Sequence, residues 1–71
     1  MEDLHYLDNV KVIDGFYKGQ QGSVIEGYQY IGFDKDRFAN RYGYKVQLGV
    51  SLAQVFIDSC YLEKISENKE V

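Results

Sequence analysis

The 71-residue sequence has no proline and no tryptophan, and it contains a single cysteine and a single histidine. One cysteine cannot form a disulfide within the chain, and Cys60 together with His5 falls short of the four ligands of a structural zinc site. We therefore expect a reducing, cytoplasmic environment and no cofactor. We interpret Cys60 as a buried small hydrophobic residue, whereas His5 lacks the matched base or nucleophile of a catalytic histidine.

Long apolar segments are also missing. No apolar run approaches the roughly 20 residues of a transmembrane helix, and the acidic N-terminal segment MEDLHYLD lacks the basic start of a signal peptide. The sequence carries no phosphate-binding GxxxxGK[ST] motif, and no further ligands follow Asp34 and Asp36 at calcium-loop spacing. Because no acid–base pair or activated nucleophile can be assembled, we expect a binding protein rather than an enzyme.

Positive charge is scarce, and it is unevenly distributed. Eight basic and 11 acidic side chains give a formal net charge of −3. Residues 11–45 hold six bases and four acids, which is +2, whereas residues 1–10 carry −3 and residues 46–71 carry −2. The net acidity argues against phosphate binding as the main function. The mildly basic middle segment keeps nucleic-acid binding open as an alternative.

Aromatic residues make up 15% of the chain, with seven tyrosines and four phenylalanines, and apolar and aromatic residues alternate in a strand pattern. In Tyr42–Leu48 every second residue is apolar or aromatic, which is the period of a strand with one buried face. No segment shows a sustained helical period. Alternation and β-branched or aromatic content predict five strands, at Asp8–Ile13, Ser23–Tyr30, Tyr42–Leu48, Ser51–Ile57 and Tyr61–Ile65.

Five short strands in so small a chain favour an all-β fold, a strongly bent antiparallel barrel whose closure removes most of the exposed sheet edge. We expect one domain over residues 1–66 and a flexible tail over residues 67–71. Gly49 predicts a tight hairpin between the third and fourth strands, and a 3₁₀ turn over residues 58–60 precedes the last strand. Residues 29–41 are interpreted as a long connection with a short helical turn at 36–40.

The first connection, in VKVIDGFYKGQQGSVI, places Gly15, Gly19 and Gly22 between two valine-rich runs. This pattern resembles the KOW motif of ribosomal proteins and bacterial transcription-elongation factors, in which a Gly-x-x-x-Gly-x-x-Gly loop joins two strands. The C-terminal half, with YKVQL, a hairpin and then VFIDSCYLEKI, looks like the last three strands of an SH3-like barrel, in which a 3₁₀ turn precedes a final strand of the Leu-Glu-x-Ile kind. The resemblance implies a small five-stranded SH3-like barrel and a role in the transcription or translation machinery. The loop lacks the family's proline, and it carries only one lysine, Lys18.

Two segments are candidates for a partner surface, because aromatic and basic side chains in loops are typical of interface hot spots. The alternative to recognition is that these rings only cover the ends of the barrel. We expect a protein partner, docked on the 14–19 loop and the 29–41 segment, with the protein acting as a small regulator or inhibitor of the kind that phages encode. The candidate partner-binding residues are Phe16, Tyr17, Lys18, Phe33, Arg37, Phe38 and Arg41.

The second hypothesis is RNA or DNA binding by the basic middle segment, with cations on phosphate and a tyrosine stacked on a base. Four tyrosines at positions 28, 30, 42 and 44 would be cross-strand neighbours if the second and third strands pair. They would then form either a stabilising ladder or an exposed stacking surface. The candidate nucleic-acid-binding residues are Lys11, Lys18, Tyr28, Arg37, Arg41 and Lys45.

Overall fold

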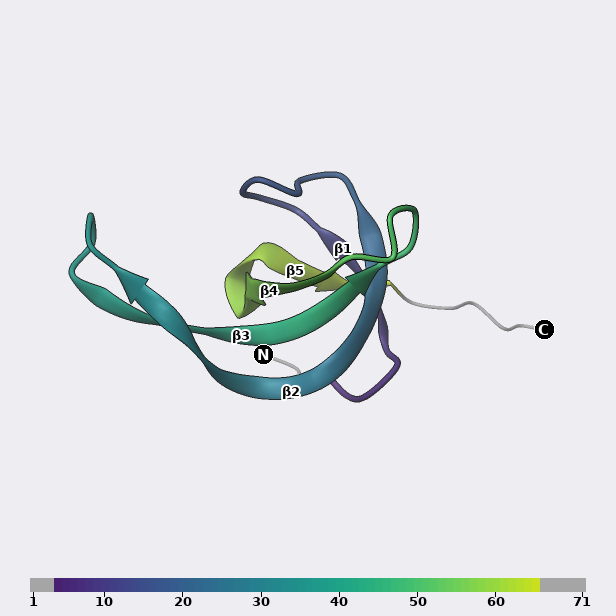
Figure 1. Ribbon diagram of the computed structural model, residues 1–71, viewed down its shortest axis with the longest axis horizontal. Coiled ribbons are helices and arrows are strands. Elements are labelled where there is room, and N and C mark those ends of the chain that lie inside the picture. Colours follow the sequence, from purple (N-terminus) through teal and green to yellow (C-terminus); the bar gives the residue numbers. More distant parts are fainter. Residues whose placement is uncertain (1–3, 66–71) are drawn as a thin grey trace.

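The computed structural model describes residues 4–65, which form an all-β fold (Figure 1). The predicted tail at 67–71 lies outside the described residues. Each of the five predicted strands is found, with shifted ends, and a 3₁₀ turn precedes the last one. The elements are β1 (Asn9–Val12), β2 (Gln21–Asp34), β3 (Ala39–Leu48), β4 (Gln54–Asp58), the 3₁₀ turn η1 (Ser59–Tyr61) and β5 (Leu62–Lys64).

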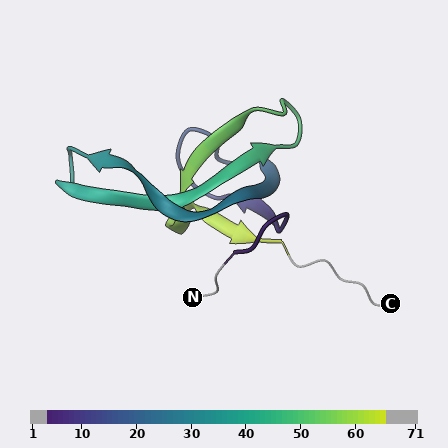
Figure 2. The same ribbon diagram turned by 60° about the horizontal axis from the view of Figure 1, so that its bottom comes forward.

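The strands form one antiparallel sheet in the order β4-β3-β2-β1-β5. Its curvature wraps the sheet around the core (Figures 1 and 2). The sheet is not closed into a barrel, so this part of the prediction is wrong. After β4 the chain passes through η1 to the free edge of β1, where Val12 pairs with Leu62, and in the described part of the chain no ladder joins β4 to β5. Among residues 4–65, β4 and β5 therefore remain the two edges of the sheet.

The core forms because the buried positions follow the two-residue period of the strands. Val10 and Val12 of β1 are buried, as are Val24 of β2 and Ile57 of β4. The predicted alternation of β3 is confirmed, because the alternate residues of this strand from Tyr44 to Leu48 all belong to the core cluster. Each fully buried aliphatic side chain contributes about 1.5–3 kcal/mol relative to exposure.

The loop between β1 and β2 is built on glycine, as predicted, although only two of the three glycines lie in the turn. Gly15 and Gly19 adopt φ values of 86° and 95°, which side chains with a Cβ rarely adopt. Gly22 lies within β2, where an added Cβ would clash with the carbonyl oxygen of Gln47. The third glycine is therefore needed for close strand packing and not for the turn.

The 29–41 segment is not a loop. It forms the outer half of a long β2–β3 hairpin, which projects from the body of the molecule as an arm (Figures 1 and 2). Register shifts occur between Glu26 and Gln29 and between Tyr30 and Gly32. These irregularities interrupt the two-residue period, which hides the strand in the sequence. The expected helical turn at 36–40 is also wrong, since residues 35–38 form the hairpin turn.

The last prediction that fails concerns Cys60, which is exposed rather than buried. It lies in η1, a 3₁₀ turn in which no residue is buried. The predicted position of this turn is shifted by one residue, and that shift moves Cys60 to its middle. Its neighbours in this turn, Ser59 and Tyr61, are not buried either.

Candidate functional site

Two adjoining clefts lie between the β1–β2 loop and the β2–β3 hairpin. They share a floor formed by Arg41, Asp58 and Tyr61. The cleft on the loop side has a volume of about 140 Å³, and Phe16 and Tyr17 contribute to it. The cleft on the hairpin side has a volume of about 290 Å³ and is completed by residues 33–35. The structure thus places the two segments that sequence reasoning selected on opposite sides of one shared floor.

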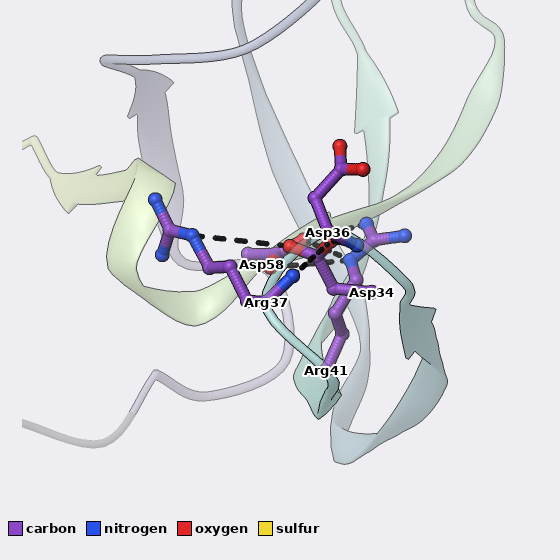
Figure 3. A network of polar contacts seen from close by, with 5 residues as sticks. All are labelled: Asp34, Asp36, Arg37, Arg41 and Asp58. Carbon is purple, nitrogen blue, oxygen red and sulfur yellow. Dashed lines mark hydrogen bonds and ion pairs between the residues drawn. The ribbon is translucent and has the colours of Figure 1, made fainter.

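The centre of this floor is an ion pair between Arg41 and Asp58 (Figure 3). The Nε of Arg41 donates to Asp58 Oδ1 at 2.9 Å and to Oδ2 at 3.2 Å, and its Nη2 donates to Oδ1 as well. The carboxylate hydrogen bonds raise the pKa of the Arg41 guanidinium above its ordinary value. Because the guanidinium is occupied in a two-pronged contact, Arg41 holds β3 to the end of β4.

The hairpin turn is organised by Asp34. Its Oδ1 accepts hydrogen bonds from the backbone N–H groups of Asp36 at 3.0 Å and Arg37 at 3.3 Å (Figure 3). Its other oxygen, Oδ2, lies 3.9 Å from Nε of Arg37. The Arg37 side chain is 76% exposed, so this long contact leaves it accessible to a partner.

The aromatic pair of the β1–β2 loop is divided between packing and exposure. Tyr17 packs against the core, whereas Phe16 is 91% exposed. Their rings meet edge to face, with centroids 4.8 Å apart. The well-packed Tyr17 thus holds the Phe16 ring at the rim of the cleft, next to the exposed Lys18.

At the hairpin tip, Phe33 and Phe38 also meet edge to face, with centroids 5.5 Å apart. Phe38 is 83% exposed and adopts a φ of +54°. A bulky residue in this left-handed region costs on the order of 1 kcal/mol. The fold gains little from Phe38, since most of its ring lies in water, and glycine or asparagine would suit this backbone better.

The candidate nucleic-acid residues are scattered over the molecule. Lys45 Nζ lies 3.6 Å from Glu26 Oε2 and 5.6 Å from the centroid of the Phe56 ring. Lys11 is exposed on β1, where it pairs with Gln21 at the end of β2 that lies farthest from the hairpin turn. Tyr28 lies on the hairpin and contacts other tyrosines. Of the partner-binding candidates, Phe16, Tyr17, Phe33 and Arg41 line the clefts and Phe38 contacts Phe33, whereas Lys11, Tyr28 and Lys45 of the nucleic-acid candidates line neither cleft.

Sequence reasoning missed Asp58, Tyr61 and Phe56, which line the clefts. The Arg41–Asp58 pair joins residues 17 positions apart, and its pairing depends on the β3–β4 register, in which Gly43 opposes Asp58. Two charged residues so far apart in the chain show no local pattern that indicates an ion pair. The pair could be predicted only from the correct β3–β4 register.

Within residues 4–65, no group of three or more histidine, cysteine, aspartate or glutamate side chains could hold a metal ion. The same part of the chain contains no helix of the length and apolarity needed to cross a membrane. No protein-family model, no curated protein and no solved structure matches the chain.

Proposed function

We propose that the protein is a non-enzymatic binding module that docks on a protein partner through the rim of the two clefts. The carrying observation is that Phe16 lines the cleft on the loop side and Phe33 lines the cleft on the hairpin side, with the exposed Phe38 in edge-to-face contact with Phe33. Phe16 and Phe38 are the aromatic anchors in this proposal, and Arg37 and Lys18 supply polar contacts. Exposed aromatic and arginine side chains at a concave surface are typical of interface hot spots.

The strain at Phe38 supports the proposal. A side chain that is mostly in water and lies on an unfavourable backbone conformation lowers the stability of the isolated chain. Contact with a partner would bury the ring and offset this cost. By contrast, Arg41 acts in the proposal as a positioning residue, because its guanidinium is already bound to Asp58.

The kind of partner follows from the KOW resemblance. The strand order β4-β3-β2-β1-β5, with a 3₁₀ turn before the last strand, supports a relationship to SH3-like domains of the KOW type. We propose a partner in the transcription or translation machinery, for which a small acidic chain would serve as a regulator or inhibitor. A cytoplasmic location is part of this proposal.

Affinity purification with three variants tests the proposal. Phe16→Ala, Arg37→Ala and Phe38→Asn should each weaken retention of the partner while the fold survives, because all three side chains are largely exposed. Gln54→Ala, on the outer strand β4, is the matched control and should retain the partner. If the three variants keep the whole set of captured proteins after nuclease treatment, the surface is wrong.

The alternative function is binding of single-stranded RNA or DNA, which the exposed Lys18, two positions after the exposed Phe16 in the same loop, favours. A stacked base and a phosphate contact would then use the same rim. This alternative requires a micromolar dissociation constant. The affinity should fall steeply as the salt concentration rises, because the release of counterions from the nucleic acid favours binding. A flat titration with a single strand at low salt would eliminate it, and loss of every captured protein after nuclease treatment would favour it.

A further inference from the structure

The cleft on the loop side combines aromatic side chains with a carboxylate. Phe16 and Tyr17 of the β1–β2 loop and Tyr61 of η1 line it, together with Asp14. Tyr17 and Tyr61 pack against the core, which limits the movement of their rings, whereas Phe16 at the rim is largely exposed. Such a lining differs from a purely apolar pocket, because aromatic faces and a carboxylate both attract positive charge.

Aromatic side chains also gather on the arm, where they pack on one another. Tyr28 and Tyr42 stack with centroids 5.8 Å apart, Tyr44 meets Tyr28 edge to face, and Tyr30 meets Tyr42 in the same way. These four residues form the predicted tyrosine ladder. The loop-side cleft differs from the ladder because Asp14 lies in its wall.

The loop that carries Asp14 is fixed against η1. The backbone N–H of Ile13 donates to the carbonyl oxygen of Tyr61 at 2.8 Å. Gly15 lies so close to the Tyr61 ring that an added Cβ would be 3.1 Å from its Cδ2 and Cε2 atoms. Contacts on both sides of Asp14 in the chain therefore hold this residue next to Tyr61, in the wall of the same cleft.

The carboxylate of Asp14 has no cationic partner in the part of the chain that the structure describes. Its Oδ1 accepts a hydrogen bond from the backbone N–H of Gly15 at 2.8 Å, and no lysine, arginine or histidine among residues 4–65 forms an ion pair with it. The other two charges of the cleft, on Arg41 and Asp58, compensate each other in their ion pair. The lining is therefore left with one unpaired negative charge.

A protein partner that covers this cleft has to supply a positive charge. Contact with the partner removes water from Asp14, and a carboxylate that loses its water without gaining a cation opposes binding. An apolar side chain would fill the space but leave the carboxylate unpaired, and an anionic group would be repelled. The net charge of −3 on the chain also favours a cationic surface on the partner.

We infer that the loop-side cleft is the binding site for an arginine side chain of the protein partner, an inference that rests on the proposed docking at the clefts. Arginine fits better than lysine because its planar guanidinium stacks on aromatic rings, is more weakly hydrated than an ammonium, and can donate two hydrogen bonds to one carboxylate. The cleft volume of about 140 Å³ is close to the roughly 150 Å³ of a cavity that admits benzene. The cleft therefore has room for one planar head group of this size.

Nuclear magnetic resonance titration of the isotope-labelled full chain with N-acetyl-arginine amide tests the site. The backbone signals of Gly15 and Phe16 and the ring signals of Tyr61 should shift, with a dissociation constant of about 1 mM or weaker, as expected for a single side chain. The citrulline analogue, in which a neutral urea replaces the guanidinium, should cause no shift at these positions. The lysine analogue should bind at least about threefold more weakly. This comparison uses the wild-type chain and does not depend on how a variant folds.

A pair of variants assigns the binding to Asp14. Asp14→Asn keeps the oxygen that accepts from Gly15, and it should weaken binding of N-acetyl-arginine amide by about tenfold. Glu63→Gln is the matched control, because it changes the net charge equally on exposed β5 and lines neither cleft. In affinity purification, Asp14→Asn should lose the partner and Glu63→Gln should retain it.

Equal binding of the citrulline or lysine analogue would overturn the inference, as would unchanged binding of the arginine probe to Asp14→Asn or retention of the partner by this variant. If the inference fails in this way while Phe16→Ala and Phe38→Asn still lose the partner, docking at the clefts stands without the arginine site. If Phe16→Ala and Phe38→Asn retain the whole captured set, the proposed function fails, and the assignment of the arginine to the partner fails with it.

Discussion

Replacement of Arg41 by alanine should destabilise the fold more than is usual for a partly exposed residue. The Arg41 side chain is 38% exposed, and its partner Asp58 is 15% exposed. A fully exposed pair would contribute about 0–1 kcal/mol, and a hydrogen bond to a charged group contributes about 1.5–3 kcal/mol. Arg41→Ala removes both donors and leaves the carboxylate of Asp58 with little access to water. We therefore expect a loss of about 2 kcal/mol in the free energy of unfolding.

Thermal and urea unfolding, followed by far-ultraviolet circular dichroism, measure this loss. A domain of this size shifts its Tm by about 4–8 °C per kcal/mol, so the expected decrease is roughly 8–16 °C. Arg37→Ala is the matched control in the same hairpin, and it should change stability by less than about 0.5 kcal/mol. Arg41→Lys should recover only part of the loss, because an ammonium cannot form the two-pronged contact.

A double-mutant cycle assigns the loss to the pair. Asp58→Asn in the Arg41→Ala background should cost much less than it does alone, with a coupling free energy of about 1 kcal/mol or more. The reasoning is refuted if Arg41→Ala is no more destabilising than Arg37→Ala. It is equally refuted if the two substitutions in the pair are additive, since the ion pair would then contribute nothing.

Two further predictions concern the backbone and the pH dependence. Gly43→Ala should destabilise the fold by about 2 kcal/mol or more in urea unfolding, because the added Cβ would clash with the carbonyl oxygen of Ile57. Gly27→Ala is the control and should be tolerated, because a Cβ added there has no atom within 4 Å. A hydrogen bond from the backbone N–H of His5 lowers the pKa of Asp8 below its ordinary value. The stabilisation from Asp8 is therefore present above the unfolded-state pKa of about 3.9 and is lost as the pH falls through the lower folded-state pKa. Thermal scans should show this acid-side loss in the wild type and a smaller one in Asp8→Asn, and identical profiles would contradict it.

Much of the sheet could be predicted from local patterns, because β1 and the inner half of β3 each have a clear two-residue alternation. Val10 and Val12 flank an exposed lysine in β1, and the alternation from Tyr44 to Leu48 matches the burial of β3. The tyrosine ladder followed from pairing these two-residue periods across adjacent strands. Each of these patterns spans only a few residues of the chain, so it does not depend on contacts between distant segments.

The arm and the edges of the sheet could not be predicted in this way. Register shifts around Glu26 and Tyr30 interrupt the period of β2, so the outer hairpin has the appearance of a loop. Closure of a barrel depends on how η1 redirects the chain, and Arg41 finds Asp58 only after β3 and β4 have paired. These features arise from contacts between distant segments, which no local pattern encodes.

The most direct test of the proposed function is the hydrogen–deuterium exchange footprint of the protein in complex with its captured, nuclease-treated partner. Docking at the clefts should slow exchange in the β1–β2 loop around Phe16 and in the hairpin turn around Phe38, relative to the free protein. Protection confined to the edge strand β5 or to the β3–β4 connection, with both of these segments exchanging as in the free protein, would contradict the proposal.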